Sequence, residues 1–320
     1  MTTISNKLRA GFADSVTATT PTLAFLTSAP VYGQLDKPRY LYEEAGLGDS
    51  SYSGEFVESE GVIPLTVSMY LTPSIAYRIF SELSGLAEPT GAVTGTNTKY
   101  TFASGSPSPA PPSYSLLREF SMFLSDGTTH ERITTVLTGA TITGAVNSMI
   151  TVELNLLGHS PTNTSITFPN ANQEDTAASK FSTAGTSLTA TGNNAVVEGD
   201  INSFTITLSA TVTELKAKLN NKYRYEGGSY SAMVAYNSTA ADNVKTMWRN
   251  STPNTVDYVL KLDNGSREIE FSLKNCFMNE RTVSAPLNEV IAEDTTWTSA
   301  PFDISSSSVQ VPTANNIVTT

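Results

Sequence analysis

The 320-residue chain has little of what most catalytic and metal sites are made of. It contains one cysteine and two histidines, and only 15% of its residues are charged. A single cysteine excludes an intramolecular disulfide and a metal site built on several thiolates. Cys276 stands in the strand-like run LKNCFM, so we interpret it as a small buried thiol.

Catalytic motifs are also missing. No nucleophile elbow, zinc-binding helix motif, phosphate-binding loop or dinucleotide fingerprint occurs in the chain. We interpret His130 and His159 as residues of a turn and of a strand end rather than as catalytic bases. Asp263 and Asn264 could offer oxygen ligands to calcium, but no regular ligand spacing surrounds them. We therefore expect no enzyme activity, no metal and no cofactor.

Positive charge is in short supply as well. The chain has 19 Lys and Arg against 30 Asp and Glu, a formal net charge of −11. Such a surface does not bind nucleic acid backbones by counterion release, and it repels DNA. No apolar run has the length of a membrane span or of a signal-peptide core, so we expect a chain that is made and folded in a cytoplasm.

What the chain has is β-forming sequence. Hydrophobic residues make up 39% of it, enough to fill a core, and 320 residues suit two domains of ordinary size. Its polarity comes mostly from Ser, Thr and Asn, which fit strand surfaces and turns better than helices. The composition predicts a mainly β fold.

One order of elements occurs twice along the chain. Each half has an alternating strand, then a short helix with Thr at its N-cap, then a hairpin with an Asp-Gly or Asn-Gly turn. In the first half these are the strand at 65–69, the helix from Thr72 and the hairpin at 122–137 (MFLSDGTTHERITTVL); in the second half they are the strand at 230–236, the helix from Thr239 and the hairpin at 260–273 (LKLDNGSREIEFSL). A long β-rich stretch follows each hairpin. We interpret the chain as a tandem duplication of one mainly β domain with a single short helix.

The remaining segments set the predicted borders. Residues 1–22 show no periodicity and are expected to form an extended arm, and the Pro-rich connector near 104–113 cannot lie inside a strand. The predicted division is an N-terminal arm and edge strand at 1–35, a first domain at 36–160, a Ser/Thr/Asn-rich linker and edge segment at 161–200, a second domain at 201–302 and a C-terminal arm at 303–320.

Two polar surfaces stand out. One is an acidic, Gly/Ser-rich loop within 43–60, of a length that is usually functional. Its acidic pairs could serve a glycosidase, but the aromatic platform of a sugar site is missing. The other is the polar side of two alternating strands, which carries Thr151, Glu153 and Asn155 in one and Glu268, Glu270 and Ser272 in the other. A surface of this kind suits ordinary solvent and also the wall of a negatively charged, water-filled channel.

A family resemblance is carried by several stretches within about 40–300: SGEFVESEGVIPLTVSMYLTPSIAYRIFSELSG, ITTVLTGATITGAVNSMITVELNLLG, INSFTITLSATV, GGSYSAMVAYNSTAADNVKTMW and YVLKLDNGSREIEFSLKN. Together they resemble the two-domain tail tube proteins, or major tail proteins, of long-tailed, siphovirus-type bacteriophages. The resemblance implies two β-sandwich or barrel domains, each with one flanking helix. It also implies trimeric, pseudo-hexameric rings that stack into a tail tube for DNA passage into the host.

The same resemblance implies partners and a place. The partners are further copies of the chain, a tape measure protein in the lumen, and tail-tip and tail-terminator proteins; the place is the virion tail, assembled in the bacterial cytoplasm without a membrane. DNA would pass without specific binding, because an acidic lumen repels phosphates. We expect Glu153, Glu268 and Glu270 to face this lumen. The expected ring-stacking elements are the N-terminal arm, the tail after Phe302 and the acidic loop with Glu43, Glu44, Asp49, Glu55, Glu58 and Glu60.

Other functions fit part of these observations. A surface β-sandwich adhesin or S-layer-like binding protein would share the acidity and the Ser, Thr and Asn content, but it would need an export signal. A capsid decoration or baseplate protein would differ mainly in its assembly. A hydrolase is the third alternative, and the missing motifs argue against it.

Overall fold

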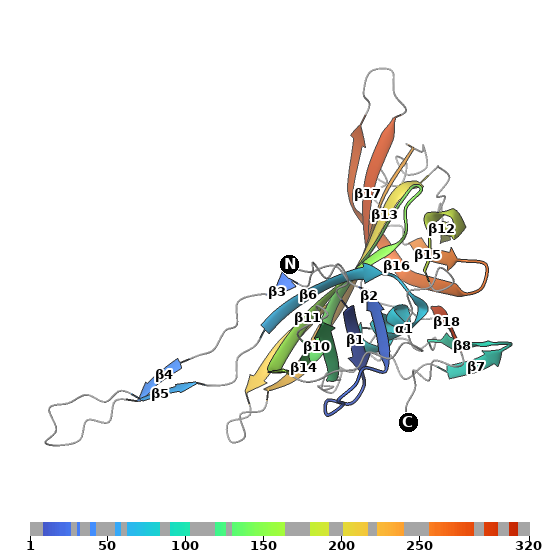
Figure 1. The fold of residues 1–320 in the computed structure, drawn as a ribbon. Helices are drawn as coiled ribbons and strands as arrows, with labels where there is room; N and C mark the ends of the chain where they lie inside the picture. Colours follow the sequence, from blue (N-terminus) through green and yellow to red (C-terminus); the bar gives the residue numbers. More distant parts are fainter. Residues whose placement is uncertain are drawn as a thin grey trace, which may run out of the picture.

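The structure is a computed structural model that describes residues 9–26, 31–32, 39–42, 55–58, 63–83, 90–102, 119–125, 130–163, 180–191, 201–216, 223–239, 256–284, 291–299 and 307–312. Within these ranges most residues lie in strands, and the one α-helix is α1 (Pro73–Leu83). The prediction of a mainly β fold is confirmed (Figure 1).

The described strands follow one another as β1 (Arg9–Ala13), β2 (Leu23–Leu26), β3 (Val31–Tyr32), β4 (Arg39–Tyr42), β5 (Glu55–Glu58), β6 (Ile63–Tyr70), β7 (Thr90–Thr94), β8 (Asn97–Thr101), β9 (Phe120–Ser125), β10 (His130–Ala145), β11 (Thr151–Asn163), β12 (Thr186–Thr191), β13 (Ile201–Lys216), β14 (Tyr223–Thr239), β15 (Val256–Asp263), β16 (Glu268–Ser284), β17 (Ala292–Ser299) and β18 (Ser308–Pro312). A 3₁₀ turn at Thr183–Gly185 precedes β12. All but β4 and β5 belong to one 16-stranded sheet.

The two halves of the chain pair their strands in the same order. In the first half the antiparallel neighbours run β1-β9-β10-β11-β6-β3. In the second half they run β12-β15-β16-β17-β14-β13. The strands of each set also occur in the same order along the chain, so each strand of the first half has a counterpart in the second. They meet where β10 pairs with β13.

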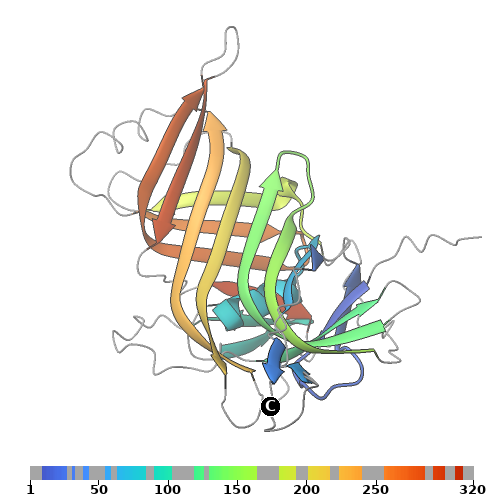
Figure 2. The ribbon, with the colours of Figure 1, turned by 90° about the vertical axis from the view of Figure 1, so that its left-hand side faces the viewer.

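The sheet folds into two layers. Figure 2 shows β11, β10, β13 and β14 side by side as a curved wall, with β12, β15 and the first part of β16 crossing behind it. We call β6, β11, β10, β13, β14, β17 and the second part of β16 the long-strand layer, and the strands behind it the covering layer. β16 serves both, because its first part pairs with β15 and its second part with β17.

Alternating apolar residues build the core between these layers. Val152, Leu154 and Leu156 are at most 2% exposed, whereas Thr151 and Glu153, on either side of Val152, are exposed. Three alternating residues of β13 are also buried, as predicted: Phe204, Ile206 and Leu208.

The helix begins where its sequence predicts. Thr72 precedes Pro73 as the N-cap, and its hydroxyl accepts the N–H of Ile75 at 3.5 Å. The apolar stripe of α1 is buried against the sheet and consists of Ile75, Ile79, Phe80 and Leu83. Phe80 stacks on Phe271 of β16 with ring centroids 5.1 Å apart, so the helix is anchored to the covering layer. The second expected helix falls on 240–250, outside the described residues.

Both expected hairpins are present. β9 and β10 pair with Ser125 opposite His130, and β15 and β16 pair with Asp263 opposite Glu268. In the second turn Gly265 has a φ of +81°, which a residue without a Cβ adopts without strain. The Asp263 carboxylate accepts the N–H of Gly265 at 2.7 Å, which fixes the turn.

Two expected loop regions contain strands. Arg9–Ala13, predicted to lie in an extended arm, forms β1 between β2 and β9. Its sequence shows no alternation because β1 is covered on both faces, with Ala10–Ala13 all buried. In the acidic loop, Glu55–Glu58 forms β5, which pairs with β4 in a ribbon that stands apart from the other strands (Figure 1).

The domain borders stay predictions. Within the predicted linker at 161–200, β12 pairs with β15 at the edge of the covering layer. β11 also extends beyond the first border, to Asn163.

We expect Phe80→Ala to lower the free energy of unfolding by about 3–5 kcal/mol, because it removes a buried ring and leaves a cavity. Phe80 is 0% exposed and contacts both Phe271 and Phe102. Urea unfolding followed by circular dichroism measures the change. Val93→Ala is the control, since Val93 is 72% exposed, and a loss as large as that of Phe80→Ala would contradict this account of the core.

Candidate functional site

The described residues offer no metal centre. No group of three or more His, Cys, Asp and Glu side chains among them could hold an ion. His130 starts β10 and is half-buried. His159 lies within β11, with its Nε2 3.5 Å from Glu119 Oε1, a contact that becomes an ion pair when the imidazole is protonated.

The cysteine is buried, as the sequence predicts. Cys276 is 0% exposed, and burial raises the pKa of its thiol to about 12. A cysteine acts as a nucleophile or metal ligand through its thiolate, so a thiol with this pKa is inert at neutral pH.

We expect Cys276 of the folded protein to resist iodoacetamide at pH 8 and to react once the chain is unfolded in guanidinium chloride. The reason is the raised thiol pKa together with complete burial. Mass spectrometry of the two samples counts the modified thiols. Rapid modification of the native protein would show that this part of β16 opens in solution.

A continuous polar surface lies on the outer face of the long-strand layer, the side away from the core. Residues that lie opposite one another on neighbouring strands continue it from β6 to β17. Its described side chains are mostly hydroxyls and amides, with a few apolar ones among them: Pro64, Thr66, Ser68, Tyr70, Thr141, Thr143, Ala145, Thr151, Glu153, Asn155, Leu157, Ser203, Thr205, Thr207, Ser209, Met233, Ala235, Asn237, Ala292, Asp294, Thr296 and Thr298.

The charges on this outer face are negative. Among the strand positions just named, Glu153 and Asp294 are the charged ones, and none is Lys or Arg. On the second part of β16, the exposed Glu280 lies opposite Thr296 and adds a third carboxylate. Lys180 borders the face at one end, with its ammonium 4.7 Å from the ring centroid of Tyr70.

Glu153 and Asp294 occupy corresponding places in the two halves. Glu153 of β11 lies opposite Ser68 on β6, whose hydroxyl donates to its Oε2 at 3.4 Å. Asp294 of β17 lies opposite Asn237 on β14, whose side-chain amide donates to its Oδ1 at 2.8 Å. Each carboxylate is therefore held on the face by a hydrogen bond from the neighbouring strand, which is β6 in the first half and the corresponding β14 in the second.

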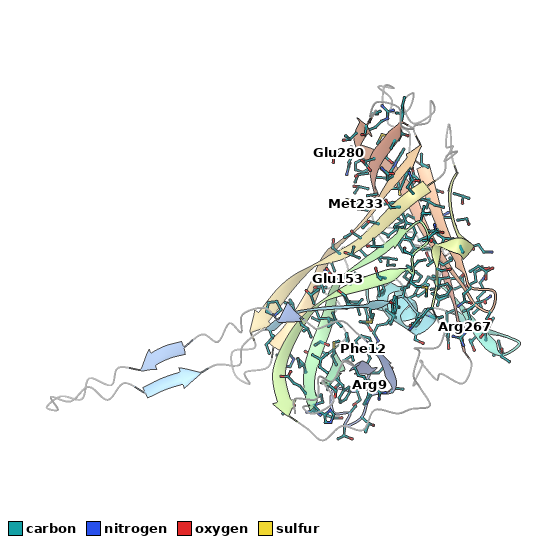
Figure 3. The ribbon with its side chains drawn as sticks, turned by 45° about the horizontal axis from the view of Figure 1, so that its top comes forward. Arg9, Phe12, Glu153, Met233, Arg267 and Glu280 are labelled. Carbon is teal, nitrogen blue, oxygen red and sulfur yellow. The ribbon has the colours of Figure 1, made fainter. Side chains whose placement is uncertain are left out.

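Glu268 and Glu270 do not join Glu153. They lie on the first part of β16, in the covering layer, and Figure 3 shows Arg267 at the start of that strand well away from Glu153. Glu268 accepts from Lys261 Nζ at 2.7 Å, and that hydrogen bond raises the pKa of the Lys261 ammonium. These two glutamates are thus beside basic groups, unlike Glu153.

The sequence pattern does not predict Asp294. Its strand, AEDTTWTS, alternates between the faces, but two of the buried positions are Glu293 and Thr295. The buried Glu293 carboxylate accepts two hydrogen bonds from the Arg281 guanidinium, at 2.8 and 3.1 Å. An ion pair occupies a core position where an apolar residue is expected. The sequence of β17 therefore does not indicate which of its faces is buried.

The polar face of β16 also differs from the expected one. Ser272 is 1% exposed, and its N–H donates to the hydroxyl of Ser307 at 2.9 Å. Ser307, the residue before β18, therefore lies against part of a surface that the sequence predicts to be open.

Only part of the acidic loop is described. Glu55 and Glu58 lie in β5, opposite Tyr42 and Arg39 of β4. The other carboxylates of the loop lie outside the described residues: Glu43, Glu44, Asp49 and Glu60. A role of this loop in ring stacking stays a prediction.

The described part of the chain has no helix long and apolar enough to cross a membrane.

Comparison with known proteins identifies a family. No curated protein matches the sequence. A family model described as "Phage tail tube protein" matches residues 4–303. Since this match covers nearly all of the 320 residues, the chain belongs to the phage tail tube protein family, whose members are structural components of the virion tail.

Proposed function

We propose that three copies of this chain form a ring, and that rings stack into the tail tube of a siphovirus-type phage, through which DNA passes into the host. The observation that carries the proposal is the outer face of the long-strand layer, which is continuous over both halves, rich in hydroxyls and amides, and acidic at Glu153 and Asp294. A wall of this chemistry suits a water-filled channel.

The number of copies follows from the two halves. Their matching strand order supports a tandem duplication, with one tube domain in each half. Three chains then supply six similar domains around an axis. Closing the ring removes exposed sheet edges, and the contacts left along the axis allow stacking.

The sign of the charge fits the passage of DNA. A phosphate backbone binds surfaces that release its counterions, and attraction to a few phosphates in each ring would add up along a stacked tube. Carboxylates repel the phosphates, and the Debye length of about 8 Å at physiological salt limits this repulsion to DNA close to the wall. The lumen therefore guides DNA without holding it.

We assign Glu153 and Asp294 to the channel face. Glu268 and Glu270 fit this role less well, because they lie in the covering layer beside Lys261 and Lys99. The acidic loop, the chain before β1 and the tail after Phe302 remain our candidates for contacts between rings. A tape measure protein would fill the lumen before ejection, and tail-tip and terminator proteins would close its ends.

Negative-stain electron microscopy of the purified protein, with a light-scattering mass on the same sample, tests the assembly. Hollow stacked rings, or trimers that polymerise on concentration, are the expected result. Monomers that never associate, even when concentrated, would contradict the tube and would favour a surface-binding sandwich, for which glycan binding is the next assay.

We expect phage carrying Glu153→Lys with Asp294→Lys to assemble tails of normal length but to lose infectivity per particle by about tenfold or more, because six added lysines per ring attract the DNA phosphates. Plaque titre divided by particle count measures the effect. The single variant Glu270→Lys in the covering layer is the matched control for the single variant Glu153→Lys, since both make the same charge change. Equal losses in both would contradict the assignment of the channel face.

A further inference from the structure

The junction between the two halves shows how one tube domain joins the next. Gly139–Ala145 of β10 pairs antiparallel with Ser203–Ser209 of β13, and Thr141 lies opposite Thr207. At this junction Ile142 of β10 is 2% exposed. The pairing thus supplies backbone hydrogen bonds and also covers apolar side chains.

The second part of β16 corresponds residue by residue to this part of β10. Thr141 of β10 lies opposite Glu153, and Thr282 of β16 lies opposite Asp294. A register shift follows Leu137 in β10, and another follows Met278 in β16, at the corresponding position. The two strands therefore share their bulge and their register.

On β16, however, the edge that β13 would cover is open. Phe277–Ser284 pairs with β17 on one side, and on its other side it pairs with no strand among the residues that the structure describes. Val283 is 45% exposed, whereas the corresponding Ile142 is 2% exposed. The apolar side chain of Val283 is thus uncovered where its counterpart in β10 is buried.

The strand that could cover this edge lies at the other end of the layer. β3 corresponds to β13, because Val31 lies opposite Thr66 on β6 just as Thr205 lies opposite Ala235 on β14. Among the described strands β3 pairs only with β6. Six strands separate β3 from the second part of β16 along the curved layer, and the two edges do not pair with each other in the single chain.

We propose that β3 of one copy pairs antiparallel with the second part of β16 of the next copy, in the register that β13 adopts on β10. This places Val31 opposite Ser284 and Tyr32 opposite Val283. The assignment rests on the proposed ring and deepens it, because it names the two edges and their register. Since the edges differ, the contact is heterologous and can close around an axis.

A cysteine pair tests the register. Residues directly opposite on antiparallel strands have Cβ atoms about 4.5–5.5 Å apart, close enough for a disulfide after a small adjustment. We expect assembled Val31→Cys/Ser284→Cys protein to give dimers and trimers on a non-reducing gel after mild oxidation, as its major species. The buried Cys276 stays in place in every variant.

The controls are the two single variants and the pair Val31→Cys/Val283→Cys, whose side chains leave neighbouring strands on opposite faces. Tubes that form without the expected cross-link, or in which the control pair is linked equally well, would overturn the proposed strand pairing but not the proposed tube. Variants and unmodified protein that all fail to form rings would overturn both proposals.

A charge at the open edge gives an independent test. We expect Val283→Lys to shift the light-scattering mass from the ring to the single chain, because a lysine would be buried in the contact. Its folding should be unchanged, as Val283 is exposed in the single chain. Val93→Lys on β7 makes the same change at a residue that is 72% exposed, and should assemble normally. Rings from Val283→Lys as abundant as those of the control would overturn the proposed edge.

Discussion

Backbone N–H and C=O groups along the edge of a strand need partners, and this requirement organises the whole molecule. At the centre of the long-strand layer, β10 meets it by pairing with β11 on one side and with β9 and then β13 on the other. The two halves of the chain become one sheet through the last of these contacts. The core, the continuous polar face and the placement of Glu153 and Asp294 all depend on it.

Local signals in the sequence predict much of this fold. The alternation of Val152, Leu154 and Leu156 and the cap at Thr72 each depend on neighbours a few residues away, and the structure agrees with both. β1 is harder to predict, because a strand covered on both faces has no period of two. The pairing of β10 with β13 joins residues that are far apart in the chain, such as Gly139 and Ser209, and no local pattern encodes it.

The candidate site divides in the same way. Glu153 stands in a clean alternating strand, so its outer position follows from the sequence. The outer position of Asp294 cannot be predicted in this way, because the core face of its strand carries Glu293, which is paired with Arg281. Glu268 and Glu270 alternate just as cleanly as Glu153, but alternation says only which side of its own strand a residue takes. It does not say to which layer that strand belongs, since β16 passes from one layer to the other.

The covalent link between the two halves changes how a ring of such chains could come apart. Of six similar seams, three would lie inside chains, where the tether keeps the partner strand at an effective concentration in the millimolar range, so a broken seam closes again at once. The other three have no tether, and dissociation has to begin there. In the ring that we propose, a duplicated chain would therefore have half as many untethered seams, and the internal and external seams could evolve separately. Ile142 at the internal seam is 2% exposed, and Val283 at the proposed external seam is 45% exposed.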